Sequence, residues 1–346
     1  MENVKQIYEK RQMKLAIFGL VIAFAGAITN SVFQNFNVAA SGIIEGDFAS
    51  GLLAAYVMSV ATLGVCEIVG GFMMVGWNFG YIGMSFKEIT RTLRVKSSHA
   101  IILSALVAGP IATAAAVMAI ALCGSTYANC IISLAPVVTA VLGVIFLKEK
   151  INIRVIIGIA VCTGGVIIAC LAPPEGITNF YVGVAIACIC PFAYAIEGLI
   201  STHAYDCVEP AMACPLYRMI VSGILEIIIA IVVCVVTGHV GWFALVFKLM
   251  FTDKLCMLYL LGTAFFMFLE YNCTNVSFVY VGAIKGEAIL WTGTLWSIPV
   301  GFAMEAMGIL PYSVTTMGII GAVAVVVGIM LVVAKPSELF QLRQHD

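Results

Sequence analysis

Ten long apolar segments, separated by short polar stretches, organise this chain of 346 residues. They lie at roughly 13–35, 49–77, 99–123, 125–147, 151–172, 180–201, 212–237, 255–277, 280–303 and 310–334. A run of about 20 apolar residues is long enough to cross a bilayer as a helix. The pattern therefore predicts an all-α membrane protein with ten transmembrane helices.

The composition agrees with this prediction. Hydrophobic residues make up 62% of the chain and charged residues only 10%, and the mean hydropathy is +1.11. A soluble domain carries about 25% charged residues, so this chain could not cover a surface that faces water. The polar start MENVKQIYEKRQMK is followed by an apolar run longer than the core of a signal peptide. We expect that run to be the first spanning helix.

The distribution of Lys and Arg predicts the orientation. With the N-terminus inside, fourteen of them fall on the cytoplasmic side and two, Lys248 and Lys254, on the other, while Lys285 lies within a span. Positive charge concentrates in cytoplasmic loops. We predict a multi-pass protein of the cell membrane with cytoplasmic tails at 1–12 and 335–346. Arg218 is one of the fourteen and is interpreted as an anchor at the inner interface.

Other chemistry is sparse. The twelve cysteines lie mostly within spans, none has the spacing of zinc ligands, and phosphate-binding and hydrolase motifs are absent. We expect no metal and no cofactor. The expected partners are a small-molecule substrate and the lipid bilayer, with no nucleic acid. Protons are a further candidate, and a homodimer is left open.

The two halves of the chain resemble each other. At a shift of 156 residues, Phe146 falls on Phe302, and a short turn with an acid follows in both halves. Gly64-Val65-Cys66-Glu67 matches Gly223-Ile224-Leu225-Glu226. This predicts two five-helix repeats, 13–172 and 180–334. Because five is odd, the second repeat should be inverted in the membrane, which is a transporter architecture.

One stretch carries a resemblance to a known family. Between Ser125 and Pro173 the chain has Leu134-Ala135-Pro136, then Phe146-Leu147-Lys148-Glu149, then a Gly-rich helix. It resembles the EamA-type repeat of the drug/metabolite transporter superfamily. Ten helices in two inverted halves fit that superfamily over essentially the whole chain.

The second half departs from the family pattern. Thr292 stands where Pro136 would fall, and Ala306 follows Glu305 where a basic residue is usual. The resemblance implies a secondary transporter with a central cavity between the repeats. It does not identify the substrate, since the family handles amino acids, amines, drugs, nucleotide sugars and organic phosphates.

Two glutamates lie deep within spans. An ionised side chain at the bilayer centre costs roughly 2.5–3.5 kcal/mol on insertion scales. Glu67 and Glu226 occupy equivalent places in the repeats, and a two-fold axis in the membrane plane would bring both to one cavity. They are candidates to bind a cationic substrate or to take up protons. Alternatively, each is protonated and serves packing only. We predict that Glu67 faces the cavity and exchanges a proton during transport.

A second polar group surrounds the expected turn near 278–280. Glu270 and Lys285 are at similar distances from this turn, so we predict that they pair, either as a structural ion pair or with Lys285 turned to the cavity. Glu287 shares a helical face with Trp291, which would suit an organic cation. Ordinary packing is the alternative for Trp291.

Weaker candidates complete the set. Asn30 belongs to a polar face, with Gln34, Asn35 and Asn37, that either lines a vestibule or ends the first helix. Asn129 is equivalent to Lys285 in the repeats, and Tyr194 is loosely equivalent to Asn30. In segment 180–201 we expect Glu197 to reach the inner interface. We also expect Pro136 to kink segment 125–147 and Pro191 to kink segment 180–201.

These observations favour a secondary active transporter of a small polar or amphipathic metabolite. Five acids against one lysine within the spans favour an amine or amino-acid-like substrate and proton coupling. An organic anion, sugar phosphate or nucleotide sugar is the alternative if Lys285 faces the cavity. An intramembrane lipid-modifying enzyme is a remote alternative, because no Ser or Asp is spaced to serve His203. We therefore expect no enzymatic activity.

Overall fold

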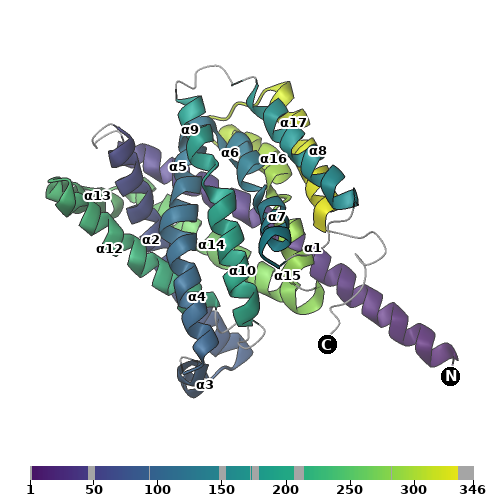
Figure 1. Ribbon diagram of the computed structural model, residues 1–346. Helices are drawn as coiled ribbons and strands as arrows, with labels where there is room; N and C mark the ends of the chain where they lie inside the picture. The colour runs from purple at the N-terminus through teal and green to yellow at the C-terminus, as the bar shows by residue number, and fades with distance from the viewer. Residues whose placement is uncertain are drawn as a thin grey trace.

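The computed structural model describes residues 2–45, 51–92, 94–147, 153–171, 173, 179–205, 214–281 and 283–333, and these residues contain helices and no strand (Figure 1). The α-helices in chain order are α1 (Glu2–Glu45), α2 (Leu52–Trp77), α3 (Phe86–Thr92), α4 (Lys96–Val107), α5 (Ala114–Cys123), α6 (Ser125–Ile132), α7 (Ala135–Leu147), α8 (Ile153–Cys170), α9 (Phe180–Ala187), α10 (Cys190–Tyr205), α12 (Val221–Val236), α13 (Val240–Thr252), α14 (Lys254–Val281), α15 (Ala283–Leu290), α16 (Gly293–Ala306) and α17 (Thr316–Val333). Wider π-helical turns join some of them: η1 (Asn78–Ile82), η2 (Ala108–Thr113) and η3 (Cys214–Ile220).

Nine of the described helical segments are long and apolar enough to cross a membrane. They correspond to nine of the ten predicted segments. The remaining one, 280–303, consists of α15 and α16 in the described residues and is not among these nine. The expected turn near 278–280 is wrong, because α14 continues through these residues to Val281.

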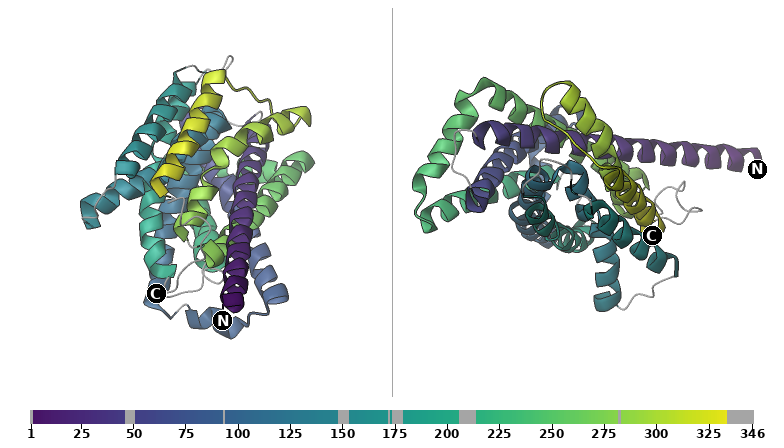
Figure 2. Two further views of the ribbon diagram at one scale, coloured as in Figure 1. Left: turned by 90° about the vertical axis from the view of Figure 1, so that its right-hand side faces the viewer. Right: turned by 90° about the horizontal axis from the view of Figure 1, so that it is seen from above.

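The first helix is longer than its apolar core at 13–35 suggested. Figures 1 and 2 show α1 running through the molecule and extending beyond it at its N-terminal end. The polar residues at 30–37 do not end it, because hydrogen bonds within the helix and to its neighbours satisfy some of them. Asn35, for example, donates from Nδ2 to the carbonyl of Ser31 at 2.8 Å.

Two prolines interrupt helices where the sequence predicted kinks. Pro136 is the second residue of α7 and Pro191 is the second residue of α10. Proline has no N–H group and cannot bond to the carbonyl four residues earlier. Those positions are Ile132 and Ala187, where α6 and α9 end.

The break between α15 and α16 occurs without a proline. Thr292 stands at this point, and its hydroxyl donates to the carbonyl of Ile289 at 2.6 Å while its backbone N–H contacts the same carbonyl. A threonine hydroxyl that satisfies a helix-end carbonyl can thus replace proline at the break.

Glycines let two pairs of helices approach closely. In the crossing of α2 and α12, a Cβ added to Gly64 would lie 2.9 Å from the carbonyl oxygen of Gly223, and one added to Gly223 would lie 2.7 Å from that of Gly64. In α8 and α17, Gly158 meets Gly328 in the same way. Glycine allows the backbones to touch, as in other membrane helix pairs.

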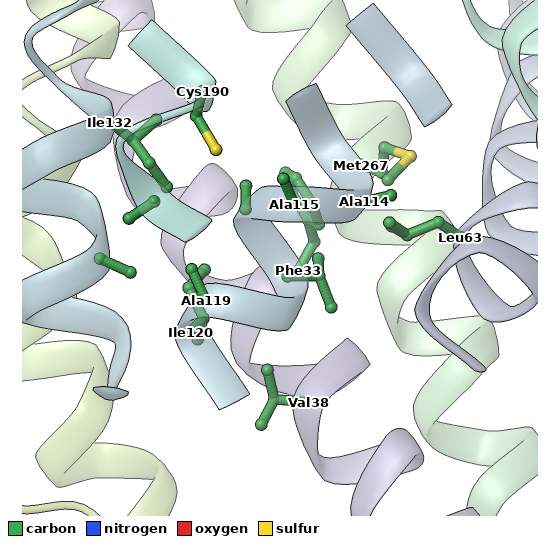
Figure 3. Close-up of a cluster of buried hydrophobic side chains, with 14 of the residues drawn as sticks. Phe33, Val38, Leu63, Ala114, Ala115, Ala119, Ile120, Ile132, Cys190 and Met267 are labelled. Carbon is green, nitrogen blue, oxygen red and sulfur yellow. The ribbon is translucent and has the colours of Figure 1, made fainter. Parts of the chain in front are cut away.

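The apolar core surrounds α5. Figure 3 shows side chains of α1, α2, α6, α10 and α14, among them Phe33 and Leu63, gathered around the alanines of this helix. Ala114 and Ala119 of α5 are fully buried. Small residues on α5 allow α1, α2, α6 and α9 to pack against it, and this packing holds the centre of the bundle in which the cavity lies.

Candidate functional site

A polar cavity of about 140 Å³ lies among helices from both halves of the chain. Its apolar walls come mainly from α5, α7 and part of α14, and its polar residues come mainly from α1, α2, α10, η3 and α14. The polar and aromatic residues that line it are Asn30, Gln34, Glu67, Thr113, Thr139, Tyr194, Glu197, Arg218, Tyr271, Glu270, Thr274, Asn275 and Trp291.

Arg218 is the centre of the charge network in this cavity. Its Nε lies 2.6 Å from Oε1 of Glu197, and its Nη1 lies 3.2 Å from Oε1 of Glu67. The guanidinium also lies over the ring of Tyr271, 5.6 Å from the ring centroid. The side chains of Arg218 and Glu67 are 5% and 0% exposed. A guanidinium can bridge two carboxylates in this way because it presents several N–H donors in one plane.

The interpretation of Arg218 as an inner-interface anchor is therefore wrong, as is the placement of Glu197 at that interface. Both lie in the cavity because the pairing of a guanidinium with two carboxylates offsets the cost of removing these charges from water. Sequence reasoning missed this pairing. The available signal was that Arg218 falls inside the apolar segment 212–237, where a lone cation needs a partner.

Glu67 and Glu226 are both buried, but their surroundings differ. Glu67 lines the cavity and binds Arg218. Glu226 is 0% exposed and is not among the described residues that line the cavity. Neither of its carboxyl oxygens has a hydrogen-bond partner within the described parts of the chain. The crossing of α2 and α12 brings the two glutamates near each other, but it does not direct both into the cavity.

Glu270, Tyr194 and Trp291 also line the cavity. The hydroxyl of Thr274 donates to Oε1 of Glu270 at 3.2 Å. The rings of Tyr194 and Trp291 contact each other with centroids 5.3 Å apart. The cavity thus contains one carboxyl group that is bound by a hydroxyl rather than a cation, together with a pair of aromatic rings.

Asn30 and Asn129 are joined through Gln34. Gln34 donates from Nε2 to Oδ1 of Asn30, and Asn129 donates from Nδ2 to Oε1 of Gln34, both at 3.0 Å. Asn30 and Gln34 line the cavity, and Asn129 lies behind them. The polar face of α1 is therefore part of the cavity wall, and Asn129 fixes its orientation.

Lys285 and Glu287 lie on α15. Lys285 is partly buried and is not among the described lining residues, and the described contacts of Glu270 do not include it. The predicted pairing of Lys285 with Glu270 is thus not observed among the described contacts. The side chain of Glu287 lies outside the described residues.

These features define a class of protein. Several long apolar helices surround a buried, charged cavity, as expected for a multi-pass membrane protein that handles small polar molecules.

Comparison with known proteins finds a family match over part of the chain. Residues 41–171 match the EamA-like transporter family. The match covers less than half of the chain and agrees with the predicted resemblance to the drug/metabolite transporter superfamily. This family consists of transporters rather than enzymes. No curated protein matches the chain.

Solved structures also match. Thirteen chains of known structure do so. One of them, described only as "Crystal structure of protein", is 10% identical in sequence, with 91% of this chain and 97% of that chain covered and a TM-score of 0.48.

Proposed function

We propose that this protein is a secondary active transporter that moves a small amine or amino-acid-like metabolite through the central cavity, coupled to protons. We further propose that it lies in the cell membrane with both termini cytoplasmic. With Arg218 assigned to the cavity, thirteen of the remaining Lys and Arg residues fall on the cytoplasmic side and two on the other. That bias still supports this orientation.

The observation that carries the proposal is the charge of the cavity. Three carboxyl groups, of Glu67, Glu197 and Glu270, and one guanidinium, of Arg218, are among the described residues that line it. When all are ionised, the carboxylates exceed the cation by two. A buried excess of negative charge is costly, and either a cationic group of the substrate or protons can neutralise it.

The arrangement suits a zwitterion in particular. Glu270 is the carboxyl without a cationic partner among its described contacts, so it can receive an ammonium group. The rings of Trp291 and Tyr194 can add cation–π attraction to the same group. Arg218 offers guanidinium donors to a carboxylate that displaces one of its two glutamates. An amino-acid-like substrate would use all three features.

Helix packing supports the inverted-repeat architecture. The first helix of each half packs against the third helix of the other half, as α1 does with α14 and as α10 does with α4. The glycine contacts between α8, the last helix of the first half, and α17, the last helix of the second half, are also reciprocal. Gly158 meets Gly328 and Gly165 meets Gly321, so residue numbers rise along α8 as they fall along α17. Such reciprocal antiparallel contacts are expected across a two-fold axis in the membrane plane.

The alternative of an organic anion, sugar phosphate or nucleotide sugar relied on Lys285. That residue is not among the described residues that line the cavity, and two carboxylates already engage Arg218. The arrangement therefore favours a cationic or zwitterionic substrate over an anionic one.

Transport into proteoliposomes tests the proposal. Purified protein would first be screened by thermal shift with amino acids, amines, sugar phosphates and nucleotides. Binders would then be offered to vesicles with and without a pH gradient. We expect an amine or amino acid to be bound and to accumulate when the gradient is present. Binding and uptake of sugar phosphates or nucleotides instead would contradict the proposed substrate class.

A further inference from the structure

Glu226 is buried between closely packed helices and is not among the described residues that line the substrate cavity. It lies on α12 three residues after Gly223, at the crossing where Gly64 and Gly223 bring two backbones into contact. On its other side it faces Gly109 of η2, and its Oε1 lies 3.0 Å from where a Cβ of that glycine would be. Three closely packed helical segments therefore enclose the carboxyl group.

Polar groups with no described partner collect at this point. Both oxygens of Glu226 are buried without hydrogen-bond partners among the described residues, and the hydroxyl of Ser222, one turn earlier on α12, has no close partner there but lies near the carboxyl group of Glu67. Ser222 faces Gly109 as well. Buried unpaired polar atoms are rare, and a cluster of them calls for an explanation.

Among the described ionisable groups around Glu226, the cation is Arg218, which is already bound to two other carboxylates. Tyr56, Cys66 and Glu67 face it from α2, and Arg218 lies eight residues earlier on the continuous helical segment of η3 and α12. The Tyr56 hydroxyl donates to the Pro110 carbonyl at 3.2 Å. Arg218 binds Glu67 and Glu197.

An ionised carboxylate in these surroundings would have no described hydrogen bond to stabilise it, whereas a neutral carboxyl group would avoid most of that cost. We infer that Glu226 is a proton-binding site separate from the substrate cavity, and that its proton holds the crossing of α2 and α12 closed. When the crossing opens, water reaches the carboxyl group and it can ionise. Its proton therefore favours the conformation seen here, by the general linkage between binding and conformation.

This inference gives proton coupling in the proposed function a definite location. A transporter that alternates between conformations must open and close contacts between its two halves. Here one such contact, between Gly64 and Gly223, lies directly beside a carboxyl group whose protonation depends on whether the contact is closed. Glu67, which is paired with Arg218 in the cavity, can then act in substrate binding.

Infrared spectroscopy of the protein in lipid vesicles tests the site without any transport. We expect wild type to show a carbonyl band of protonated carboxyl groups that persists at neutral pH, and we expect Glu226→Gln to reduce this band. Glu197→Gln is the matched control, since it removes a carboxylate that is paired with Arg218 and should leave the band intact. Loss of the band in Glu197→Gln, or an unchanged band in Glu226→Gln, would overturn the assignment.

Transport then tests coupling. Glu226→Gln should retain substrate exchange between equal concentrations across the membrane but lose accumulation driven by a pH gradient. If Glu226→Gln still accumulates substrate as wild type does, the coupling role fails. If wild type shows neither exchange nor accumulation of any amine or amino acid, the proposed function fails. The infrared experiment still tests the proton-binding site, because it does not depend on transport.

Discussion

Glu67 and Glu226 occupy matching places in two similar stretches of the sequence, yet they lie in different surroundings. Each follows a glycine by three positions, and those two glycines touch at the crossing of α2 and α12. Glu67 lines a cavity and binds a guanidinium, whereas Glu226 is enclosed against Gly109 with no described partner. A repeated sequence motif can place two carboxyl groups at matching positions of their helices. The neighbouring residues then determine the charge partner and the hydrogen bonds of each group.

Arg218 is the residue that breaks the symmetry. It belongs to the second half and binds a glutamate from each half, Glu67 and Glu197. As a result one glutamate of the repeated pair has a charge partner and the other has none. The predictions below test this difference, beginning with the change that should have the largest effect.

Removing the guanidinium should destabilise the protein most. In Arg218→Ala, Glu67 and Glu197 lose their cation while they remain buried, and breaking a buried ion pair typically costs about 3–5 kcal/mol. We expect a large fall in the thermal unfolding temperature and loss of transport. The variant that also carries Glu67→Gln and Glu197→Gln should recover much of the stability but not transport. Equal instability of the single and triple variants would show that packing, not charge, accounts for the loss.

Widening the helix crossing should have the next largest effect. In Gly64→Ala, the added Cβ would lie 2.9 Å from the carbonyl oxygen of Gly223, so the helices must separate. Overpacking of this kind costs about 1–3 kcal/mol. Gly164→Ala on α8 is the control, since its added Cβ would have nothing within 4 Å. Thermal unfolding should be lowered in the first variant and not in the second.

Changing the acid that has no cationic partner should weaken binding rather than folding. Glu270→Gln keeps the size of the side chain and can still accept the bond from Thr274, but it cannot attract an ammonium group. We expect roughly tenfold weaker binding of a cationic ligand, with little change in the unfolding temperature. Unchanged affinity in titrations of the purified variant would remove Glu270 from the substrate site.

The amide chain behind the cavity should have the smallest effect. Asn129→Ala removes the bond to Oε1 of Gln34, and a lost hydrogen bond of this kind costs about 0.5–1.5 kcal/mol. We expect a small fall in stability and a modest loss of affinity in ligand titrations of the variant. Thr163→Ala, on the exposed side of α8, is a suitable control because its hydroxyl bonds only within its own helix among the described contacts.

The sequence was sufficient to predict most of the fold. The apolar segments gave the helical, membrane-spanning class, and Pro136 and Pro191 marked two helix breaks, because a missing N–H acts within one turn of the same helix. The length of α1 was harder to predict. Asn35 looked like the end of an apolar run, and only the contacts within the folded helix show that it can lie inside.

The site was less predictable, because its main contacts link residues that are far apart in sequence. Arg218 and Glu67 are separated by 151 positions. Counting charges within the apolar segments could have suggested that Arg218 needs an acid, but not which acid. The pairing of Lys285 with Glu270 was inferred from a turn near 278–280, whereas α14 continues to Val281, so that pairing stays a prediction without this support.

The most direct test of the central claim compares Glu67→Gln with Glu226→Gln in substrate binding. Titrations would use whichever amine or amino acid binds wild type, with the unfolding temperature of each variant measured as a check on folding. We predict that Glu67→Gln alters affinity several-fold because it changes the charge around Arg218 in the cavity, and that Glu226→Gln leaves affinity at neutral pH unchanged. Equal effects of the two substitutions on affinity would contradict the claim that these equivalent glutamates do different work.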